Sequence, residues 1–396
     1  MKDASLAREC TQRVKRLQRL LREKGIDGAI LVQNMDLYYL IGTDQNGILW
    51  VPEKGDPLFL VRRSYERALQ DGLIEHIVPL KSLSQVPERI TEHSGAKPTR
   101  MGLEMDVLPA RLYLSYRDLF PQVEIVDISP LIRSVRMVKS GLEISLIRGA
   151  AEIADRLFMK VPELLRESET EIDLALRAEA FYRSHGHPGI SPMRTFNVHN
   201  VYGHIMAGAG AAMPSASPGP TGGTGVGPFL SHGAGHGRIK PNEPVLFDYT
   251  SSRGGYISDQ SRIYCLGDLP EQFHKAHSVM IDVQEAVSKE GKPGTRAGDL
   301  YALALEIVRK AGLSEGFMGY PQPVPFVGHG VGLELDEWPL ISRDSGHILE
   351  KGMVIALEPK IVLPGRGVVG VENTFLVRED GMEKLSRFPD DIVIVS

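Results

Sequence analysis

The stretch PVLFDYTSSRGGYISDQSRIY, residues 244–264, decides the fold of the C-terminal half of this 396-residue chain. Two apolar runs flank a Gly-containing turn, a pattern typical of a β-hairpin, and the runs contain Asp248 and Asp259. The midpoint between these aspartates falls between Arg253 and Gly254. A hairpin symmetric about that point places the two aspartates directly opposite each other, with Cβ atoms about 4.5–5.5 Å apart. Carboxylates that close repel each other unless a proton or a cation lies between them.

The same arrangement recurs in IALEPKIVLPGRGVVGVENTFLV, residues 355–377. Glu358 and Glu372 are equidistant from Gly365, which lies in the turn between two apolar runs. Each glutamate is the only acid in its run, so both are expected to be buried. Two pairs of acids, each symmetric about a Gly-containing turn, indicate a shared cation site rather than exposed edge carboxylates.

A histidine surrounded by glycines lies between the two hairpins, in FVGHGVGLELDEWP, residues 326–339. The glycines leave the imidazole of His329 approachable by a ligand. The sequence therefore predicts five metal ligands: Asp248, Asp259, His329, Glu358 and Glu372. Four carboxylates and one neutral imidazole carry a charge of −4, which balances two divalent ions.

The ligand types narrow the choice of metal and predict a reaction. Oxygen ligands with a single nitrogen suit Mn²⁺, Co²⁺, Zn²⁺ or Fe²⁺, and affinity rules alone do not choose among these ions. Mn²⁺ is the expected ion. Two such ions about 3.5–4 Å apart share a water and lower its pKa from about 15.7 toward about 7. Hydrolysis of an amide is the expected chemistry.

These motifs resemble those of the pita-bread metallohydrolases, which include methionine aminopeptidase, Xaa-Pro aminopeptidase, prolidase and creatinase. The aspartate pair, the GHGVG histidine, the ALEP glutamate and the VENT glutamate match the ligand positions of that family in order and spacing. Residues 13–32 and 37–43 resemble the creatinase-type N-terminal domain. The resemblance implies a Xaa-Pro aminopeptidase or prolidase-like dipeptidase, in which a metal-bridging hydroxide attacks and Glu358 carries the proton from the bridging water to the leaving amine.

The expected fold class is α+β, with two domains. Residues 1–135 are predicted to form a creatinase-type α/β domain with a structural or interface role, and residues 136–396 a pita-bread catalytic domain. In the second domain, a helix is expected over residues 142–165, and a capping box at Ser168 and Glu171 is expected to start the next helix. Residues 203–237 are rich in Gly, Ala, Ser and Pro and are expected to form a loop that borders the active site.

Several positions around the predicted ligands depart from the family pattern. Asp336 stands where proline-specific relatives have a second histidine, and it would either repel an oxyanion or act as a base. The sequence has Gly370 and Asn373 where relatives read Arg and Asp in an RxED motif. Ser215 occupies the place of the substrate-side histidine that relatives have before the first aspartate.

Three histidines are candidates for the missing substrate-side group. His232 lies sixteen residues before Asp248, near the usual distance, and is the expected replacement. His204 and His236 are weaker candidates with an expected structural role.

The departures leave two other functions open. One is a non-peptidase enzyme on the same fold, either a creatinase-like C–N hydrolase or a lyase that uses Asp336 as its base. The other is a binding protein that kept the fold and lost catalysis.

Composition limits the partners. The chain has 42% hydrophobic and 24% charged residues and a net charge of −5, so neither nucleic acid nor a membrane is expected as a partner. It has only two cysteines, Cys10 and Cys265, and neither a signal-peptide pattern nor a long apolar run, which predicts a cytoplasmic protein. The expected substrate is a peptide or another small molecule, and the two-domain relatives imply a homodimer.

Overall fold

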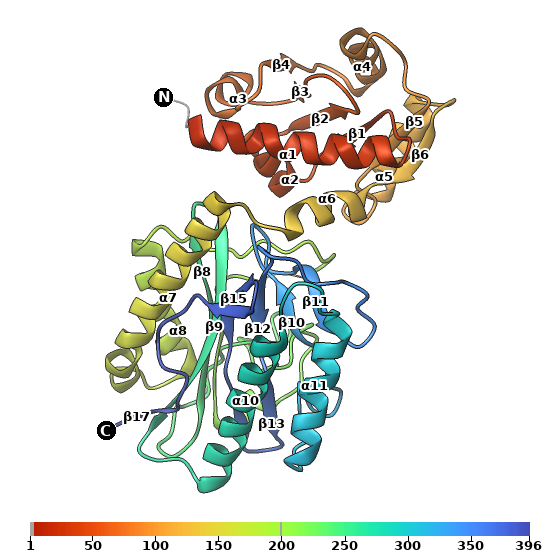
Figure 1. Ribbon diagram of the computed structural model, residues 1–396. Helices are drawn as coiled ribbons and strands as arrows, with labels where there is room; N and C mark the ends of the chain where they lie inside the picture. Colours follow the sequence, from red (N-terminus) through yellow and green to blue (C-terminus); the bar gives the residue numbers. More distant parts are fainter. Residues whose placement is uncertain (1–3, 199) are drawn as a thin grey trace. The chain divides into compact units, whose positions relative to one another are not determined.

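The computed structural model describes residues 4–198 and 200–396, which divide into two compact units (Figure 1). The first unit extends to Arg136 and also includes Arg194–Phe196. The second unit comprises Met137–Met193 and Asn197–Ser396.

The first unit is built on a six-stranded sheet with the strand order β4-β3-β2-β1-β5-β6. Its strands are β1 Gly28–Leu31, β2 Gly47–Pro52, β3 Leu58–Val61, β4 His76–Pro79, β5 Arg100–Leu103 and β6 Glu124–Asp127. Its helices are α1 Ala4–Glu23, α2 Asn34–Ile41, α3 Tyr65–Asp71, α4 Val86–Ser94, α5 Ala110–Leu119 and α6 Ser129–Met137. The central strand β1 pairs antiparallel with β2 and parallel with β5, so the sheet is mixed.

Helix α1 shows how the sequence determines an element of this unit. Val14, Leu17 and Leu21 recur at helical spacing and are buried. The helix ends before Gly25, which has a φ of 62° and lets the amide of Ile26 donate to the carbonyl of Leu21 at 2.9 Å. This left-handed turn is the glycine C-cap typical of helix ends.

A buried ion cluster in the first unit includes a residue from much later in the chain. The Arg194 guanidinium lies 2.6 Å from Asp36 and 2.7 Å from Asp106, and Arg136 lies 2.7 Å from Asp36. Burial and the neighbouring Asp36 raise the pKa of Glu104 well above its usual value. Two arginines therefore compensate buried acids inside this unit.

The second unit contains three sheets, with the strand orders β17-β9-β8-β7, β11-β10-β12-β15-β16 and β13-β14. The strands are β7 Gly203–Ala207, β8 Val245–Arg253, β9 Tyr256–Leu266, β10 Phe326–Gly330, β11 Glu337–Ser342, β12 Val354–Leu357, β13 Lys360–Leu363, β14 Gly367–Gly370, β15 Asn373–Arg378, β16 Gly381–Lys384 and β17 Val393–Val395. A bridge between Ser261 of β9 and Glu372 joins two of the sheets.

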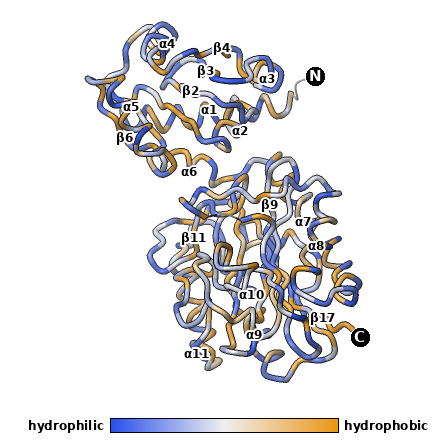
Figure 2. The backbone as a smooth tube through the Cα atoms, turned by 180° about the vertical axis from the view of Figure 1, so that it is seen from behind, coloured by the Kyte–Doolittle hydropathy of each residue, from blue (hydrophilic) through white to orange (hydrophobic). Residues whose placement is uncertain are grey.

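Helices pack against these sheets (Figure 1). They are α7 Gly141–Arg166, α8 Glu171–Ser184, α9 Gly208–Ala211, α10 Glu271–Glu290 and α11 Ala297–Lys310. Helix α7 packs on β8 and β9 through small buried residues, among them Ala150 and Ala154, while α10 packs on β13 and β14. In Figure 2 the helices of this unit alternate between hydrophobic and hydrophilic residues, as expected for helices with one buried face.

The start of α8 differs from the sequence prediction. Thr170, not Ser168, is the N-cap, and it forms a capping box with Asp173. Ser168 instead donates to the carbonyl of Leu164 at 2.8 Å. The Glu171 carboxylate accepts from the amides of Ala207 and Gly235 at 2.7 and 2.8 Å and so ties the glycine-rich segment to α8.

Each unit has its own hydrophobic core. The core of the first unit includes Ile30, Trp50 and Leu60, and the larger core of the second includes Phe273, Met280 and Ile355. Within the described residues, no helix combines the length and hydropathy needed to cross a membrane.

Candidate metal centre

The five predicted ligands all lie in the second unit, on neighbouring strands or beside them. Asp248 is on β8, Asp259 on β9 and His329 on β10. Glu358 lies between β12 and β13, and Glu372 lies between β14 and β15. The four carboxylate residues are buried and His329 is half-buried, as expected for groups that share a site inside a fold.

The turn of the first hairpin differs from the symmetric prediction. Arg253 pairs with Tyr256, and Gly254 and Gly255 form a two-residue turn between them. Both glycines have positive φ, 58° and 83°, the geometry of a type I′ turn, which suits the twist of paired strands.

This turn changes the cross-strand partners of the two aspartates. Asp248 faces Ser261 and Asp259 faces Thr250, so the prediction that the aspartates face each other directly is wrong. They are diagonal neighbours instead. Because the partner has shifted by two residues and side chains alternate with a period of two, both aspartates still point to the same face of the sheet.

The second hairpin confirms the predicted symmetry. Lys360 pairs with Gly370 on one side of the glutamates, and Leu357 pairs with Asn373 on the other, so Gly365 is the centre of both segments. Glu358 and Glu372 lie where the ladder is interrupted between these segments. They are 5% and 1% exposed, which confirms that they are buried.

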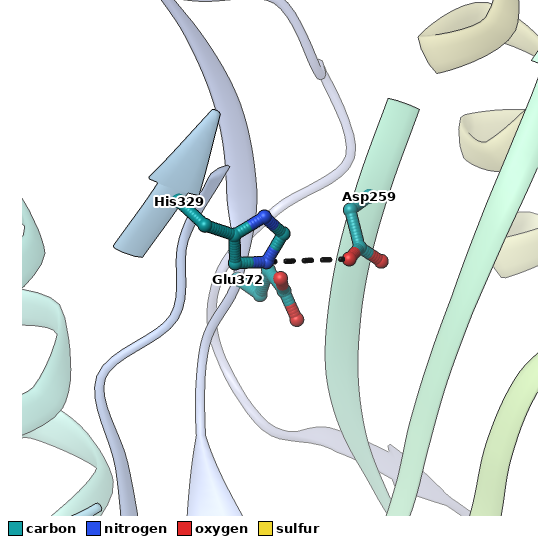
Figure 3. Close-up of side chains that lie close together, drawn as sticks. All are labelled: Asp259, His329 and Glu372. Atoms are coloured by element: carbon teal, nitrogen blue, oxygen red, sulfur yellow. Dashed lines mark ion pairs between the residues drawn. The ribbon is translucent and has the colours of Figure 1, made fainter. Parts of the chain in front are cut away.

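His329, Asp259 and Glu372 form a cluster with the geometry of a cation site (Figure 3). One ligand atom from each residue lies within 4.8 Å of the others. The Nε2 atom of His329 lies 3.8 Å from an oxygen of Asp259 and 3.6 Å from an oxygen of Glu358. These separations are too long for hydrogen bonds, so the groups do not satisfy one another directly.

Two further observations fit a bound cation. Nδ1 of His329 lies 3.2 Å from the carbonyl of Gly330, which can only accept, so this contact favours the tautomer with its proton on Nδ1 and its lone pair on Nε2. Within the described part of the chain, the buried Oδ1 of Asp259 has no hydrogen-bond partner. An oxygen-rich donor set with one imidazole suits a divalent transition metal.

The carboxylates of the cluster repel one another, as expected for groups that share a cation. Burial, together with repulsion from Asp248, raises the pKa of Asp259 to about 7. Burial and the neighbouring Asp259 raise the pKa of Glu372 well above its usual value. Without a cation, this cluster therefore tends to hold a proton in place of one of its charges.

A lysine that the sequence analysis did not consider lies among these acids. The Nζ atom of Lys360 lies 2.8 Å from Asp248, 2.9 Å from Glu358 and 2.8 Å from Glu372. Its side chain is 1% exposed. Burial alone would lower the pKa of Lys360, but the three carboxylates raise it well above its usual value, so the amine is charged.

Gly370 explains how this lysine fits. A Cβ atom at position 370 would lie 2.5 Å from the Pro359 carbonyl and 2.7 and 2.8 Å from the Cα and Cγ atoms of Lys360. The departure at Gly370 and the lysine opposite it are therefore two parts of one feature. The signal in the sequence was that Lys360 and Gly370 are equidistant from Gly365.

Asn373, the other departure in that motif, belongs to a buried network behind Glu372. Its amide nitrogen donates to Gln284 at 2.7 Å and to Asp390 at 2.9 Å, while its oxygen accepts from Arg262 at 2.8 Å. Arg262 also donates to the carbonyl of Glu372 at 2.9 Å. An aspartate at position 373 would place a carboxylate against Asp390, whereas the amide joins the network as both donor and acceptor.

The candidate substrate-side histidines lie in different surroundings. On β7, His204 faces Asp248, and its ring meets that of His232 edge to face, with centroids 5.4 Å apart. His236 is exposed. The structure thus places His204, a weaker candidate in the sequence analysis, on the strand beside a predicted ligand.

Burial keeps both paired histidines neutral at neutral pH. It lowers the pKa of His204 to about 4, and it also lowers the pKa of His232. Ser215, which stands at the expected histidine position, is half-buried in the glycine-rich segment.

Asp336 lies half-buried between β10 and β11. The turn that carries it is held by the neighbouring Glu337, which accepts from the amide of Leu333 at 3.0 Å. Glu337 also pairs with Lys139 at 2.9 Å, and both side chains are buried.

Comparisons with known proteins agree with this architecture. The family model of metallopeptidase family M24 matches residues 145–379, and that of the creatinase/prolidase N-terminal domain matches residues 13–138. A Xaa-Pro dipeptidase of Pyrococcus furiosus is 27% identical over 381 residues, covering 95% of this chain and 98% of the relative. A Xaa-Pro dipeptidase of Lactobacillus helveticus is 30% identical over 74% of this chain and 72% of the relative. The crystal structure of a prolidase from Pyrococcus horikoshii matches with a TM-score of 0.79 at 25% identity, covering 96% of this chain and 99% of the other.

Proposed function

The chain belongs to metallopeptidase family M24, and from this premise we propose that it is a metal-dependent Xaa-Pro dipeptidase. Its first unit has the creatinase-like fold and its second the pita-bread fold of prolidases. The observation that carries the proposal is the acid and imidazole cluster of the second unit, in a chain that resembles Xaa-Pro dipeptidases over nearly its whole length. This likeness favours a peptidase over the non-peptidase and binding-protein alternatives.

Of the five ligands that the sequence predicts, this proposal assigns metal binding to Asp259, His329, Glu358 and Glu372, because Asp248 lies outside the cluster that fits an ion. They supply carboxylate oxygens and one imidazole nitrogen, a donor set that suits Mn²⁺, which we propose as the native ion. A divalent ion held there supplies Lewis acidity, polarising the scissile carbonyl and lowering the pKa of water.

Glu358 is the proposed proton carrier. One of its oxygens accepts from Lys360 at 2.9 Å and the other lies 3.6 Å from His329, so the carboxylate has a fixed position at the edge of the cluster. From there it can take a proton from the attacking water and give it to the leaving amine. General acid–base catalysis of this kind typically contributes about 10²–10⁴-fold to the rate.

The substrate-side groups are His232, with His204 beside it, and Asp336. A neutral imidazole can donate one hydrogen bond and accept another, which suits the amide and carboxylate of a dipeptide. Asp336 is proposed as a substrate-side group because it stands where proline-specific relatives have a second histidine. We also propose that the protein is a cytoplasmic homodimer. Sedimentation that detects only a 43.6 kDa species would refute the dimer.

The test is hydrolysis of Xaa-Pro dipeptides by purified protein loaded with Mn²⁺. We expect cleavage of Ala-Pro and a loss of about 10²–10⁴-fold in Glu358→Gln, with the metal content measured in the same samples. Glu179→Gln is the control, because Glu179 accepts a hydrogen bond from Tyr249 outside the cluster and its substitution should leave activity unchanged. Absence of cleavage for every Xaa-Pro peptide by metal-loaded protein would refute the proposal.

A further inference from the structure

The acids of the centre form two groups. One surrounds the site that fits a divalent ion, and the other surrounds the ammonium of Lys360. On one side, His329, Asp259 and Glu372 form the cluster that fits a divalent ion. On the other side, Asp248 lies outside that cluster and is 2.8 Å from the ammonium of Lys360. Glu358 and Glu372 contribute to both sides, since each has an oxygen within 2.9 Å of the ammonium.

Lys360 uses its full hydrogen-bonding capacity on these acids. An ammonium has three donors and no acceptor, and the three carboxylates Asp248, Glu358 and Glu372 each receive one of them. A cation that entered between the same oxygens would have to displace the ammonium. If the ammonium stayed, the two like charges would repel each other in a buried site. The ammonium therefore uses the three carboxylates that a second ion would need as ligands.

The backbone holds the lysine in this position. Lys360 is the first residue of β13, its carbonyl accepts from Met318 at 2.9 Å, and its stem packs against the bare backbone of Gly370. With 1% of the side chain exposed, the ammonium is shielded from solvent in this position.

We propose that the ammonium of Lys360 takes the place of the second metal ion, so that this chain binds one divalent ion, at Asp259, His329, Glu358 and Glu372. The inference rests on the proposed function in assuming that this centre binds metal, and it corrects the expected number of ions from two to one. The sequence-based charge count gave two ions because it omitted Lys360. With the ammonium included, the charge of the groups changes from −4 to −3, so two divalent ions would leave an excess positive charge of one.

The experiment counts ions without using turnover. Full-length protein is stripped with a chelator, dialysed against Mn²⁺ and measured by elemental analysis, together with Lys360→Ala and Lys139→Ala. We expect one ion per chain in the wild type and two in Lys360→Ala. Lys139→Ala is the matched control and should bind one, because Lys139 is an equally buried lysine paired with Glu337.

Other ion counts overturn the inference. Two ions or none in the wild type would contradict the single-ion centre, and one ion in a folded Lys360→Ala would show that the lysine does not exclude the second. Should Lys360→Ala not fold, anomalous scattering from wild-type crystals grown with Mn²⁺ decides the question: one peak supports the inference and two refute it. One ion without Xaa-Pro cleavage would refute only the proposed function, and two ions with cleavage would refute only this inference.

Discussion

Replacing Lys360 with alanine should make the stability of the protein depend far more strongly on metal. The substitution removes three charge-assisted hydrogen bonds of 2.8, 2.9 and 2.8 Å and leaves buried carboxylates without their cation. Loss of one partner from a buried ion pair costs about 3–5 kcal/mol. For a unit of this size, about 2–4 °C per kcal/mol gives a fall in Tm of ~6–20 °C in chelator.

Metal should reverse much of this loss. With a second ion able to enter the variant, saturation at about 100 times its Kd adds about 2.7 kcal/mol of stability that the wild type cannot gain. The increase in Tm between chelator and Mn²⁺ should therefore exceed that of the wild type by ~5–11 °C.

Differential scanning calorimetry of both proteins in chelator and in Mn²⁺ measures this difference. Lys139→Ala should lose stability in both buffers and gain from Mn²⁺ no more than the wild type, because its partner Glu337 lies outside the metal cluster. An equal gain from metal in the wild type and Lys360→Ala would show that the ammonium does not replace an ion.

Three further predictions concern the surroundings of the cluster. Burial and Asp248 raise the pKa of Asp259 from 3.8 to about 7, so between these pH values the metal-free folded state binds more protons than the unfolded state. The free energy of unfolding should therefore fall as pH rises through this window, by up to about 4 kcal/mol. Denaturant unfolding of the wild type and Asp259→Asn in chelator checks this, and a pH dependence that is the same in both would refute it. Gly370→Ala should lower the free energy of unfolding by about 1–3 kcal/mol, since the new Cβ would lie 2.5 Å from a backbone oxygen. Gly346→Ala is the control and should change it by less than about 0.5 kcal/mol, because a Cβ there would have no atom within 4 Å. Asp336→Ala should lower kcat/KM for Ala-Pro by about 10–100-fold at an unchanged metal content, the effect of one lost charged hydrogen bond to the substrate, and a wild-type kcat/KM would show that Asp336 does not contact the substrate.

The sequence located the candidate centre because its ligand types and spacings are local signals. Asp248 and Asp259 lie on the paired strands β8 and β9, Glu358 and Glu372 lie between strands of the second hairpin, and the structure brings these segments together. The predicted register of the first hairpin was wrong because the register depends on the type of turn, which in turn depends on backbone torsions. Here Gly254 and Gly255 both adopt positive φ and form a two-residue turn.

Lys360 escaped the sequence analysis for a different physical reason. Lysine is almost never fully buried unless it is paired, so a single lysine in an apolar strand is normally expected to reach solvent. Its burial here depends on three carboxylates from separate segments and on the missing side chain of Gly370, and only the folded chain shows that combination. The N-cap of α8 was predicted at the wrong residue because two positions have capping-box spacing. Ser168 is followed three residues later by Glu171, and Thr170 by Asp173.

The presence of Arg194 in the first unit has a consequence for attempts to express that unit separately. A fragment cut after Arg136 would contain Asp36, Asp106 and Glu104 but lack the guanidinium that lies 2.6 Å from Asp36 and 2.7 Å from Asp106. Such a truncation product would keep Arg136 beside Asp36 but lose the second arginine of that buried carboxylate, which would destabilise it. A stabilised version would carry either a grafted copy of residues 194–196 or a neutral replacement for Asp36.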